Sequence, residues 1–426
     1  MLWLLACTST VEPDDSLPVE TETEVPADDT EPTETGSAYA EPAVCDVQVA
    51  PGSVPGLQRW PYLQLGTTDS MTVMFGSSQD AKVAEVGWGR VDTEHTLAAS
   101  SNAIAGKRPL KLWSATLTDL EPGTEYCYQV SVDGAVLAAG LRFRTAPGRT
   151  DAPVKFIVIG DFGAGTQDQL MVRDQMLAHI EGVDLLITTG DNAYNTGRWE
   201  EVDEFVFEIN RDILHRVVTF PTTGNHDYAT ERAAPYLANF MLPENAWRVS
   251  DNERYYRADW GPLSILALDT EKPIRDITEE ATDDQGDWLL HQLSQDDLRP
   301  WVLPVFHKPG VEGHETRGPD IHVLAHFIPL FEAYGVRLVF TGHNHHYERF
   351  KPLMNNAEDV TPGGVTYVVT GGGGRGLYPQ GEEPRRAVGV KEHHFMLGEA
   401  DGCFIRMTAI SKTGEELDHF GLNRCD

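Results

Sequence analysis

The stretch Val154-Lys-Phe-Ile-Val-Ile-Gly-Asp-Phe-Gly163 indicates the fold of the larger part of this chain. A short run of mostly apolar, β-branched residues ends at Gly160 and Asp161, as expected for a buried strand that ends in a tight turn. The same arrangement recurs four times further along the chain, and helical stretches lie between the runs. Alternating strands and helices predict a layered α/β domain.

Polar side chains that can bind metal ions follow each of the five predicted strands. In layered α/β folds, ligands bind beyond the carboxyl ends of the strands. Carboxylates and imidazoles that converge at one sheet edge repel one another or stay unsatisfied unless a cation holds them. A glycine precedes the polar residues in four of the five loops, which allows a side chain to project from a tight turn. The loops contain Gly160-Asp161-Phe-Gly163, Gly190-Asp191-Asn-Ala-Tyr194, Gly224-Asn225-His226-Asp227, His307 and Gly342-His343-Asn-His345.

Each loop taken alone has an ordinary structural explanation. A Gly-Asp pair after a strand is common, a single histidine such as His307 is more often structural, and Asn225-His226 could form a turn or a helix cap. The presence of all five loops in one chain favours a shared metal site over five separate structural roles.

Residues 45–147 predict a β-sandwich. Short stretches of alternating residues, such as 70–75, 83–88 and 112–117, are separated by turn residues without a helical period. The segment Leu120-Glu-Pro-Gly-Thr-Glu-Tyr126-Cys-Tyr128 resembles the tyrosine corner of fibronectin type III domains. No residue in this part has a catalytic pattern, so we expect it to have a structural or positioning role.

The five loops are similar to the signature of the calcineurin-like metallophosphoesterase superfamily. Tyr194, together with the run from His343 to Arg349, narrows the resemblance to the purple acid phosphatases. The residues at 59–64 and 143–147 resemble the N-terminal domain of the plant-type members.

This resemblance extends from Cys45 into the 380s and implies a two-domain fold. A fibronectin III-like β-sandwich at 45–147 would be followed by an α/β/β/α metallophosphoesterase sandwich at 153–426. The glycine-rich segment 370–376 lacks the Lys-Ser/Thr pair and following helix of a nucleotide loop, so we expect it to pack under the metal loops.

The resemblance also implies a dinuclear metal centre bridged by Asp191. Two carboxylates and a phenolate suit a hard trivalent ion such as Fe(III), whereas mostly neutral donors suit Fe(II), Zn(II) or Mn(II). One ion would be held by Asp161, Asp191, Tyr194 and His345, and the other by Asp191, Asn225, His307 and His343.

Two further histidines are expected to act on a phosphate ester bound at this metal centre. The resemblance implies that His226 and Asn225 bind the substrate phosphate, while His314 contacts the substrate and protonates the leaving alkoxide. A solvated loop histidine is the alternative for His314. We expect Asp227 to orient His226 rather than to bind metal.

The activity implied is that of an acid phosphatase, in which a metal-activated hydroxide attacks the phosphorus of a small phosphate monoester. A phosphodiesterase with the same two metals is an alternative, because the five loops do not distinguish one ester bond from two. A non-catalytic surface protein that binds phosphate is another alternative.

Charge and composition exclude other classes of protein. The formal net charge is −33, and residues 1–42 contain eleven acidic residues and no Lys or Arg, so the remainder carries −22. Such a surface repels phosphate backbones, which argues against a nucleic-acid partner. No apolar run approaches the roughly 20 residues of a membrane-spanning helix. The composition leaves the oligomeric state open.

The N-terminal residues predict export. Residues 1–7 resemble the end of a bacterial lipoprotein signal, with Cys7 as the lipidated residue and the sole membrane contact through that lipid, although a plain cysteine in an unstructured tail is the alternative. Residues 8–42 predict an acidic, disordered tether rich in Thr, Glu and Pro. The sequence thus indicates an exported protein, at a bacterial cell surface or outer membrane, or otherwise secreted.

The remaining cysteines, Cys45, Cys127, Cys403 and Cys425, form an even set that an exported protein is expected to pair. Four cysteines allow three connectivities. Proximity in sequence favours Cys403–Cys425, which leaves Cys45–Cys127.

Overall fold

The structure is a computed structural model that describes residues 43–45, 48–50, 52, 55–103, 110–271, 284–358 and 363–425. The expected signal segment at 1–7, its Cys7 and the tether at 8–42 lie outside the described residues. Within the described part, no helix has both the length and the apolar character needed to span a membrane.

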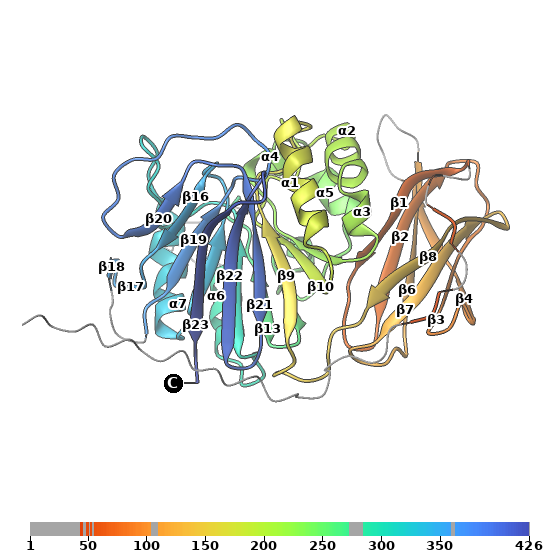
Figure 1. The fold of residues 1–426 in the computed structure, drawn as a ribbon, viewed down its shortest axis with the longest axis horizontal. Helices are drawn as coiled ribbons and strands as arrows, with labels where there is room; N and C mark the ends of the chain where they lie inside the picture. The colour runs from red at the N-terminus through yellow and green to blue at the C-terminus, as the bar shows by residue number, and fades with distance from the viewer. Residues whose placement is uncertain are drawn as a thin grey trace, which may run out of the picture. The chain divides into compact units, whose positions relative to one another are not determined.

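The N-terminal part is a β-sandwich of two antiparallel four-stranded sheets (Figure 1). The facing sides of the sheets bury large side chains such as Phe75, Trp113 and Tyr128. The hydroxyl of Tyr126 accepts a hydrogen bond from the backbone N–H of Glu121 at 2.8 Å, which is the contact expected of a tyrosine corner. One sheet contains β1 (Leu57–Gln64), β2 (Met71–Ser78), β6 (Leu110–Leu117) and β5 (Ser100–Ala103), and the other β4 (His95–Ala98), β3 (Ala84–Gly89), β7 (Glu125–Val132) and β8 (Ala135–Arg144).

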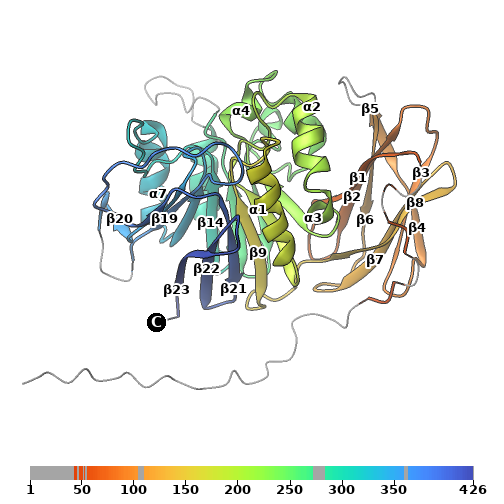
Figure 2. The ribbon, with the colours of Figure 1, turned by 45° about the horizontal axis from the view of Figure 1, so that its top comes forward.

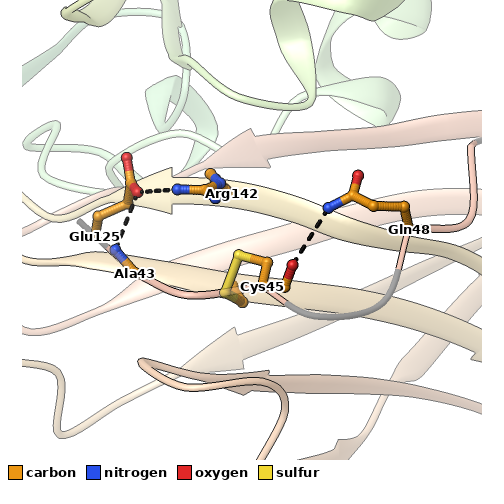
Figure 3. Close-up of a disulfide and its surroundings, with 6 residues drawn as sticks. Ala43, Cys45, Gln48, Glu125 and Arg142 are labelled. Atoms are coloured by element: carbon orange, nitrogen blue, oxygen red, sulfur yellow. Dashed lines mark hydrogen bonds and ion pairs between the residues drawn. A yellow bond between two sulfur atoms is a disulfide. The ribbon is translucent and has the colours of Figure 1, made fainter.

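Two disulfides join segments of the chain. Cys45 is bonded to Cys127 on β7, across 82 residues (Figure 3). Beside this disulfide, the Glu125 carboxylate accepts a hydrogen bond from the backbone N–H of Ala43. The second disulfide bonds Cys403 to Cys425.

The second part of the chain contains a six-stranded mixed sheet. Its first three strands along the chain are parallel to one another, whereas the last three form an antiparallel meander. The order is β11 (Val218–Pro221), β10 (Val183–Thr188), β9 (Val154–Ile159), β21 (His394–Ala400), β22 (Phe404–Ser411) and β23 (Glu416–Asn423).

A seven-stranded sheet packs against the first, and four of its strands are parallel. The order is β12 (Tyr256–Trp260), β13 (Leu263–Ala267), β14 (Trp301–Phe306), β15 (Leu338–Thr341), β19 (Thr366–Thr370), β16 (Tyr347–Phe350) and β20 (Arg386–Val390). A separate small hairpin consists of β17 (Leu353–Met354) and β18 (Ala357–Glu358).

Helices cover the outer faces of the two sheets. Helix α1 (Gln167–Ala178) buries Val172 and Met176 against the six-stranded sheet, beside which it lies in Figure 2. Trp288 of α6 (Asp284–Leu293) and Phe331 of α7 (Ile328–Ala333) belong to a separate apolar cluster with residues of the seven-stranded sheet. The result is the α/β/β/α order predicted from the sequence. The remaining helical segments are α2 (Trp199–Glu201), η1 (Val202–Glu208), α3 (Arg211–Leu214), α4 (Asn225–Tyr228), α5 (Ala234–Asn239), η2 (Val249–Asp251), α6 (Asp284–Leu293), η3 (Val323–Phe327) and α7 (Ile328–Ala333).

Strand β1 connects the sandwich to the α/β domain through Arg59. The side chain of Arg59 is 4% exposed, donates to Asn239 Oδ1 at 2.6 Å and forms an ion pair with Asp203. Its guanidinium lies 4.2 Å from the centre of the Phe207 ring. The hydroxyl of Tyr62, three residues along β1, donates to the Asn239 carbonyl at 2.7 Å. These contacts hold one sheet of the sandwich to the α/β domain.

Candidate metal centre

The five polar loops lie at the carboxyl ends of strands from both sheets. Asp161, Asp191 and His343 have φ values of 56°, 50° and 68°, so each turn places its donor in the left-handed region of backbone space. The neighbouring glycines provide the space that these donors need. A Cβ at Gly224 would lie 2.3 Å from Asp191 Oδ1, and one at Gly342 would lie 2.6 Å from Asp161 Oδ2.

The buried hydroxyl of Tyr194 lies among three acceptor atoms. Its oxygen is 2.8 Å from Asp161 Oδ1, 2.8 Å from Asp191 Oδ2 and 3.1 Å from His345 Nε2. The Gly376 carbonyl lies 2.8 Å from His345 Nδ1, which leaves Nε2 with a lone pair in the neutral ring. Because a phenol has one proton to donate, the other two contacts oppose lone pairs unless a cation lies between them.

His307 is the centre of a second group of donors. Its Nε2 lies 3.2 Å from Asn225 Oδ1, 3.2 Å from His343 Nδ1 and 3.4 Å from Asp191 Oδ2. Its Nδ1 lies 2.9 Å from the Thr189 carbonyl, a contact that fixes the ring and directs Nε2 inward. The two groups share Asp191.

The pKa values show how these groups balance charge when no metal is bound. Burial opposes the charged form of His307, but the carboxylates of Asp191 and Asp161 outweigh burial and raise the pKa of His307 to about 10. Burial and the neighbouring His307 lower the pKa of His343 to about 2. Burial and the two carboxylates hold the pKa of Tyr194 well above its usual range. A proton on His307 therefore offsets part of a negative charge that a cation would otherwise neutralise.

This donor set fits a pair of metal ions. Ligand atoms of Asp161, Asp191 and His307, all three buried, lie within 4.8 Å of one another. The remaining donors of the predicted set, Tyr194, Asn225, His343 and His345, surround these three at the distances given above. Two carboxylates, a phenol, an amide oxygen and three imidazoles are donors that suit iron, zinc or manganese.

His226 lies at the edge of this centre. Its backbone N–H donates to Asp191 Oδ1 at 2.7 Å, and its ring centre lies 4.4 Å from that of Tyr194. The side chain is 31% exposed, so it can reach both the centre and solvent. This is a suitable place for a group that contacts a bound ester.

His314 lies further out, on the loop after β14. Its Nδ1 accepts hydrogen bonds from the backbone N–H groups of Thr316 and Arg317, at 3.1 and 3.2 Å. Its ring stands edge-on to Tyr378, with the centres 5.4 Å apart. Burial, Arg317 and His346 lower the pKa of His314 below its usual value, so the neutral ring is favoured at neutral pH.

Asp227 does not orient His226, which corrects the expectation from the sequence. The ring Nδ1 of His226 lies instead against the Asn195 carbonyl. The buried carboxylate of Asp227 accepts from the backbone N–H of Gly224 at 2.9 Å and from Asn192 Nδ2 at 3.0 Å. Asp227 therefore ties the second loop to the third. The sequence could not show that these donors would face Asp227. Every residue except proline has a backbone N–H, and the position of the Asn192 amide depends on how the second loop folds.

Replacing Asp227 by Asn is expected to lower the free energy of unfolding by about 2–3 kcal/mol, because the new NH₂ group opposes buried N–H donors. Thermal or urea unfolding of the full chain measures this effect. Asp174→Asn, which changes a 61% exposed carboxylate on α1, is the control. Equal stability of the two variants would contradict the assignment.

Three further residues beside the centre were not found from the sequence. Tyr378 stacks on His345 with ring centres 3.9 Å apart, while Arg317 and Arg375 lie over the Tyr378 and Tyr194 rings respectively. The only signal was the glycine-rich segment 370–376, which does pack against the metal loops. A Cβ at Gly371 would lie 2.4 Å from the Asn344 carbonyl.

Comparison with known proteins gives two family matches. Residues 61–145 match the purple acid phosphatase N-terminal domain and residues 154–347 match the calcineurin-like phosphoesterase family. All five polar loops lie within the second match.

Individual relatives agree with these matches. The chain is 25% identical to probable inactive purple acid phosphatase 24 of Arabidopsis thaliana, over 86% of this chain and 69% of that protein. It is 27% identical to purple acid phosphatase 21 of the same plant, over 62% of this chain and 58% of that protein. The structure of a purple acid phosphatase from yellow lupin seeds has the same fold, with a TM-score of 0.74, 20% identity and coverage of 85% of this chain and 74% of that one.

The α/β domain, with its five loops, matches the calcineurin-like phosphoesterase family. The sandwich that precedes this domain is the purple acid phosphatase N-terminal domain. Both parts of the chain are therefore similar to those of purple acid phosphatases.

Proposed function

We propose that this protein hydrolyses phosphate monoesters at a dinuclear metal centre, as an acid phosphatase. The observation that carries the proposal is the position of the Tyr194 hydroxyl, within 3.1 Å of two carboxylate oxygens and an imidazole nitrogen. Neutral hydrogen bonding does not satisfy such a group, whereas a hard cation does. Some relatives have names that include the words probable inactive, so activity itself is part of the proposal.

The two groups of donors supply the proposed ligands. Asp191 would bridge the ions, because its Oδ2 lies near both the Tyr194 hydroxyl and His307 Nε2. The group with two carboxylates and a phenol favours Fe(III), and the group with imidazoles and an amide favours Fe(II), Zn(II) or Mn(II). Asp161, Tyr194 and His345 would complete the first set, and Asn225, His307 and His343 the second.

The ions, when bound, would supply a water nucleophile of lowered pKa and positive charge for the phosphoryl oxygens. The protein side chains would provide the remaining functions. His226, partly exposed above Asp191, would donate a hydrogen bond to a phosphoryl oxygen, with Asn225 beside it. His314 would take part in proton transfer to the leaving oxygen, through the Nε2 that its backbone contacts leave free.

Phosphodiester hydrolysis is the second candidate, because nothing among the seven donors selects one ester bond over two. Comparison of kcat/KM for phenyl phosphate and bis(p-nitrophenyl) phosphate tests the choice. A higher value for the monoester supports the proposal, and a higher value for the diester favours the alternative. If the metal-loaded protein hydrolyses neither substrate, the non-catalytic alternative, a protein that only binds phosphate, is favoured.

The Tyr194→Phe variant tests the metal assignment. We expect iron in the wild-type protein and a visible band from charge transfer between the tyrosinate and Fe(III). The variant should lose this band, since it removes the phenolate. Elemental analysis and the visible spectrum measure both properties, and Tyr334→Phe, a 43% exposed tyrosine, is the control.

Two bound zinc or manganese ions in a colourless protein would be compatible with a phosphoesterase and would exclude the assignment of iron. No stoichiometric metal after reconstitution would contradict the dinuclear site.

We also infer that the protein works in an oxidising environment outside the cytosol. The two disulfides support this inference, because such bonds persist in exported proteins. Mass spectrometry of the native protein under non-reducing conditions tests it. Free thiols at Cys45 and Cys127 in protein taken from its own cells would contradict it.

A further inference from the structure

A pocket lined by arginine side chains lies at the edge of the seven-stranded sheet opposite to the candidate metal centre. The pocket includes Trp301, the first residue of β14, and Arg337, which directly precedes β15. The metal donors His307 and His343 follow the other ends of the same two strands, and the six residues of β14 span about 20 Å. In Figure 1, β23 ends at this edge, away from α4, which carries Asn225. A ligand in the pocket therefore lies too far from the metal donors to touch them.

Three arginines from separate segments line this pocket, which has a volume of about 350 Å³. Arg299 lies between α6 and β14, Arg337 lies between α7 and β15, and Arg424 follows β23. The backbone N–H of Arg424 donates to the Cys403 carbonyl at 3.0 Å, next to the disulfide that joins Cys403 to Cys425. Segments far apart in the sequence thus bring three guanidinium groups to one place.

The three guanidinium groups have few partners in the protein. Arg337 Nε is buried and has no hydrogen-bond partner among the described residues. Within the same residues, neither Arg337 nor Arg424 has a carboxylate at ion-pair distance. Arg299 Nε lies 3.6 Å from Asp259 Oδ2, but the Asp259 carboxylate is already bonded to Arg257 at 2.7 and 2.9 Å. Because N–H donors without a partner are costly when they are buried, these groups favour an acceptor from a ligand.

The cations also repel one another. Burial and the neighbouring Arg337 lower the pKa of Arg424 below its usual value. Burial disfavours a charged group, and a second charge of the same sign adds to that cost. Asp296, the acidic residue of the lining, is exposed, and no ion pair joins it to these arginines in the part of the chain that the structure describes. In a chain with a net charge of −33, this pocket is a local reversal of sign that attracts anions.

We propose that Arg299, Arg337 and Arg424 form a binding site for a small, multiply charged oxyanion. The ligand carries phosphate or sulfate groups, or several carboxylates, because a guanidinium presents its donors in a planar fork that matches two oxygens of such a group. It carries at least two negative charges, because two of the arginines have no carboxylate partner in the described residues. A volume of about 350 Å³ is within the usual range for sites that bind small molecules.

This site is separate from the proposed phosphatase reaction. The three arginines lie at the opposite ends of the strands from the metal donors, and the ligand undergoes no chemical change there. A binding measurement therefore tests the site, and the activity of the metal centre serves as an internal control.

Isothermal titration calorimetry of the full, metal-loaded chain tests the proposal, with sulfate, inorganic phosphate and malonate as the probes at constant ionic strength. Arg337→Gln and Arg424→Gln are each expected to weaken the binding of at least one probe by at least about tenfold. Arg406→Gln is the matched control, because Arg406 is an exposed arginine of β22 that does not line this pocket. The affinities of the control should stay within about twofold of the wild-type values.

A second measurement separates this site from the metal centre, to which sulfate and phosphate are also expected to bind. Inhibition of phenyl phosphate hydrolysis by each anion reports the metal centre, and it should be unchanged in Arg337→Gln and Arg424→Gln. The probes also identify the chemistry of the ligand. A loss confined to sulfate and phosphate supports a site for phosphate-type groups, and a loss confined to malonate supports a site for carboxylates.

Three results would count against the site. Equal affinities for all three probes in the wild-type protein and in both arginine variants would overturn the proposal. An equal loss of affinity in Arg406→Gln would also overturn it, since that loss would indicate a general effect of charge. Acetate that binds as tightly as malonate would overturn the assignment of a multiply charged ligand.

The test remains decisive if one variant or the proposed function fails. Arg424 is exposed, so Arg424→Gln is expected to fold even if Arg337→Gln does not, and thermal unfolding of both variants checks this. If the wild-type protein does not hydrolyse phenyl phosphate, the calorimetric measurement is unaffected, because the heat of binding does not depend on catalysis. Anion binding that is lost in Arg424→Gln would then support the site in a protein without phosphatase activity.

Discussion

Replacing Asp191 by Asn is expected to lower kcat/KM for phenyl phosphate by at least about 10³-fold, because the carboxylate is proposed to bind both metal ions. Its Oδ2 lies 2.8 Å from the Tyr194 hydroxyl and 3.4 Å from His307 Nε2, so the side chain belongs to both groups of donors. An amide is neutral and offers one acceptor oxygen where the carboxylate offers two. The variant should also retain fewer than two metal ions per chain.

Steady-state kinetics and elemental analysis of the same preparations measure the two effects. Asp174→Asn serves as the control, since its carboxylate is 61% exposed and pairs with Arg173 on the surface of α1. Full metal content together with more than a tenth of the wild-type activity in Asp191→Asn would show that Asp191 does not bridge the ions.

Replacing Arg59 by Ala is expected to lower the free energy of unfolding by about 3–5 kcal/mol, the range for loss of one partner from a buried ion pair. The change leaves Asp203, whose side chain is 12% exposed, without its cation and removes the hydrogen bond to Asn239. It also removes the guanidinium that lies over the Phe207 ring. All of these contacts join the sandwich to the α/β domain.

Urea unfolding of the full chain, followed by both fluorescence and circular dichroism, measures the loss. Arg149→Ala is the matched control, because this arginine pairs with Asp151 on the surface and is 63% exposed. Its effect should stay below about 1 kcal/mol. An Arg59→Ala variant as stable as this control would contradict the proposed importance of the interface. If one domain of the Arg59→Ala variant unfolds at a lower urea concentration than the other, the stabilising effect of Arg59 lies at the boundary between the two domains.

The interface also explains how the sandwich serves the metal centre without contributing a ligand. Arg59 and Tyr62 both bind Asn239, which lies in α5, shortly after the loop that carries Asn225 and His226. The sandwich, for which a structural role was expected, thus contacts the α/β domain at Asn239. Loss of that contact should affect activity only through the stability of the fold.

The alternation of strands and helices could be predicted from the sequence because its signals are local, whereas the α/β/β/α order of layers followed from the resemblance to metallophosphoesterases. A strand of about six residues, a glycine and a polar residue occupy one short segment, and parallel strands bring their carboxyl ends to one edge. Asp161 and Asp191 are identified in this way, and His307 follows its strand directly, without a glycine. The helical segment from Val323 to Ala333 illustrates the limit of such reasoning. It is divided into the π-helical η3 and the α-helical α7, and Pro329, near the start of α7, has no N–H for the α-helical ladder.

Contacts between loops could not be predicted from local patterns. Arg317 meets His343 across 26 residues, and His345 meets Gly376 across 31. The loops that carry Arg317 and Arg375 have no hydrophobic period, so their paths depend on packing against the metal loops. Asp227 shows the same limit, because its partners are backbone and amide N–H groups of other loops.

Local sequence patterns were thus sufficient to indicate a layered α/β domain, the resemblance to purple acid phosphatases and the donors of the candidate metal centre, because strand period, turn glycines and ligand chemistry reside in short segments. The partner of Asp227, the cations beside the centre and the contact between the two domains depended on the folded structure. Each of these features requires residues far apart in the chain to meet, and the packing of whole sheets and loops determines which of them do.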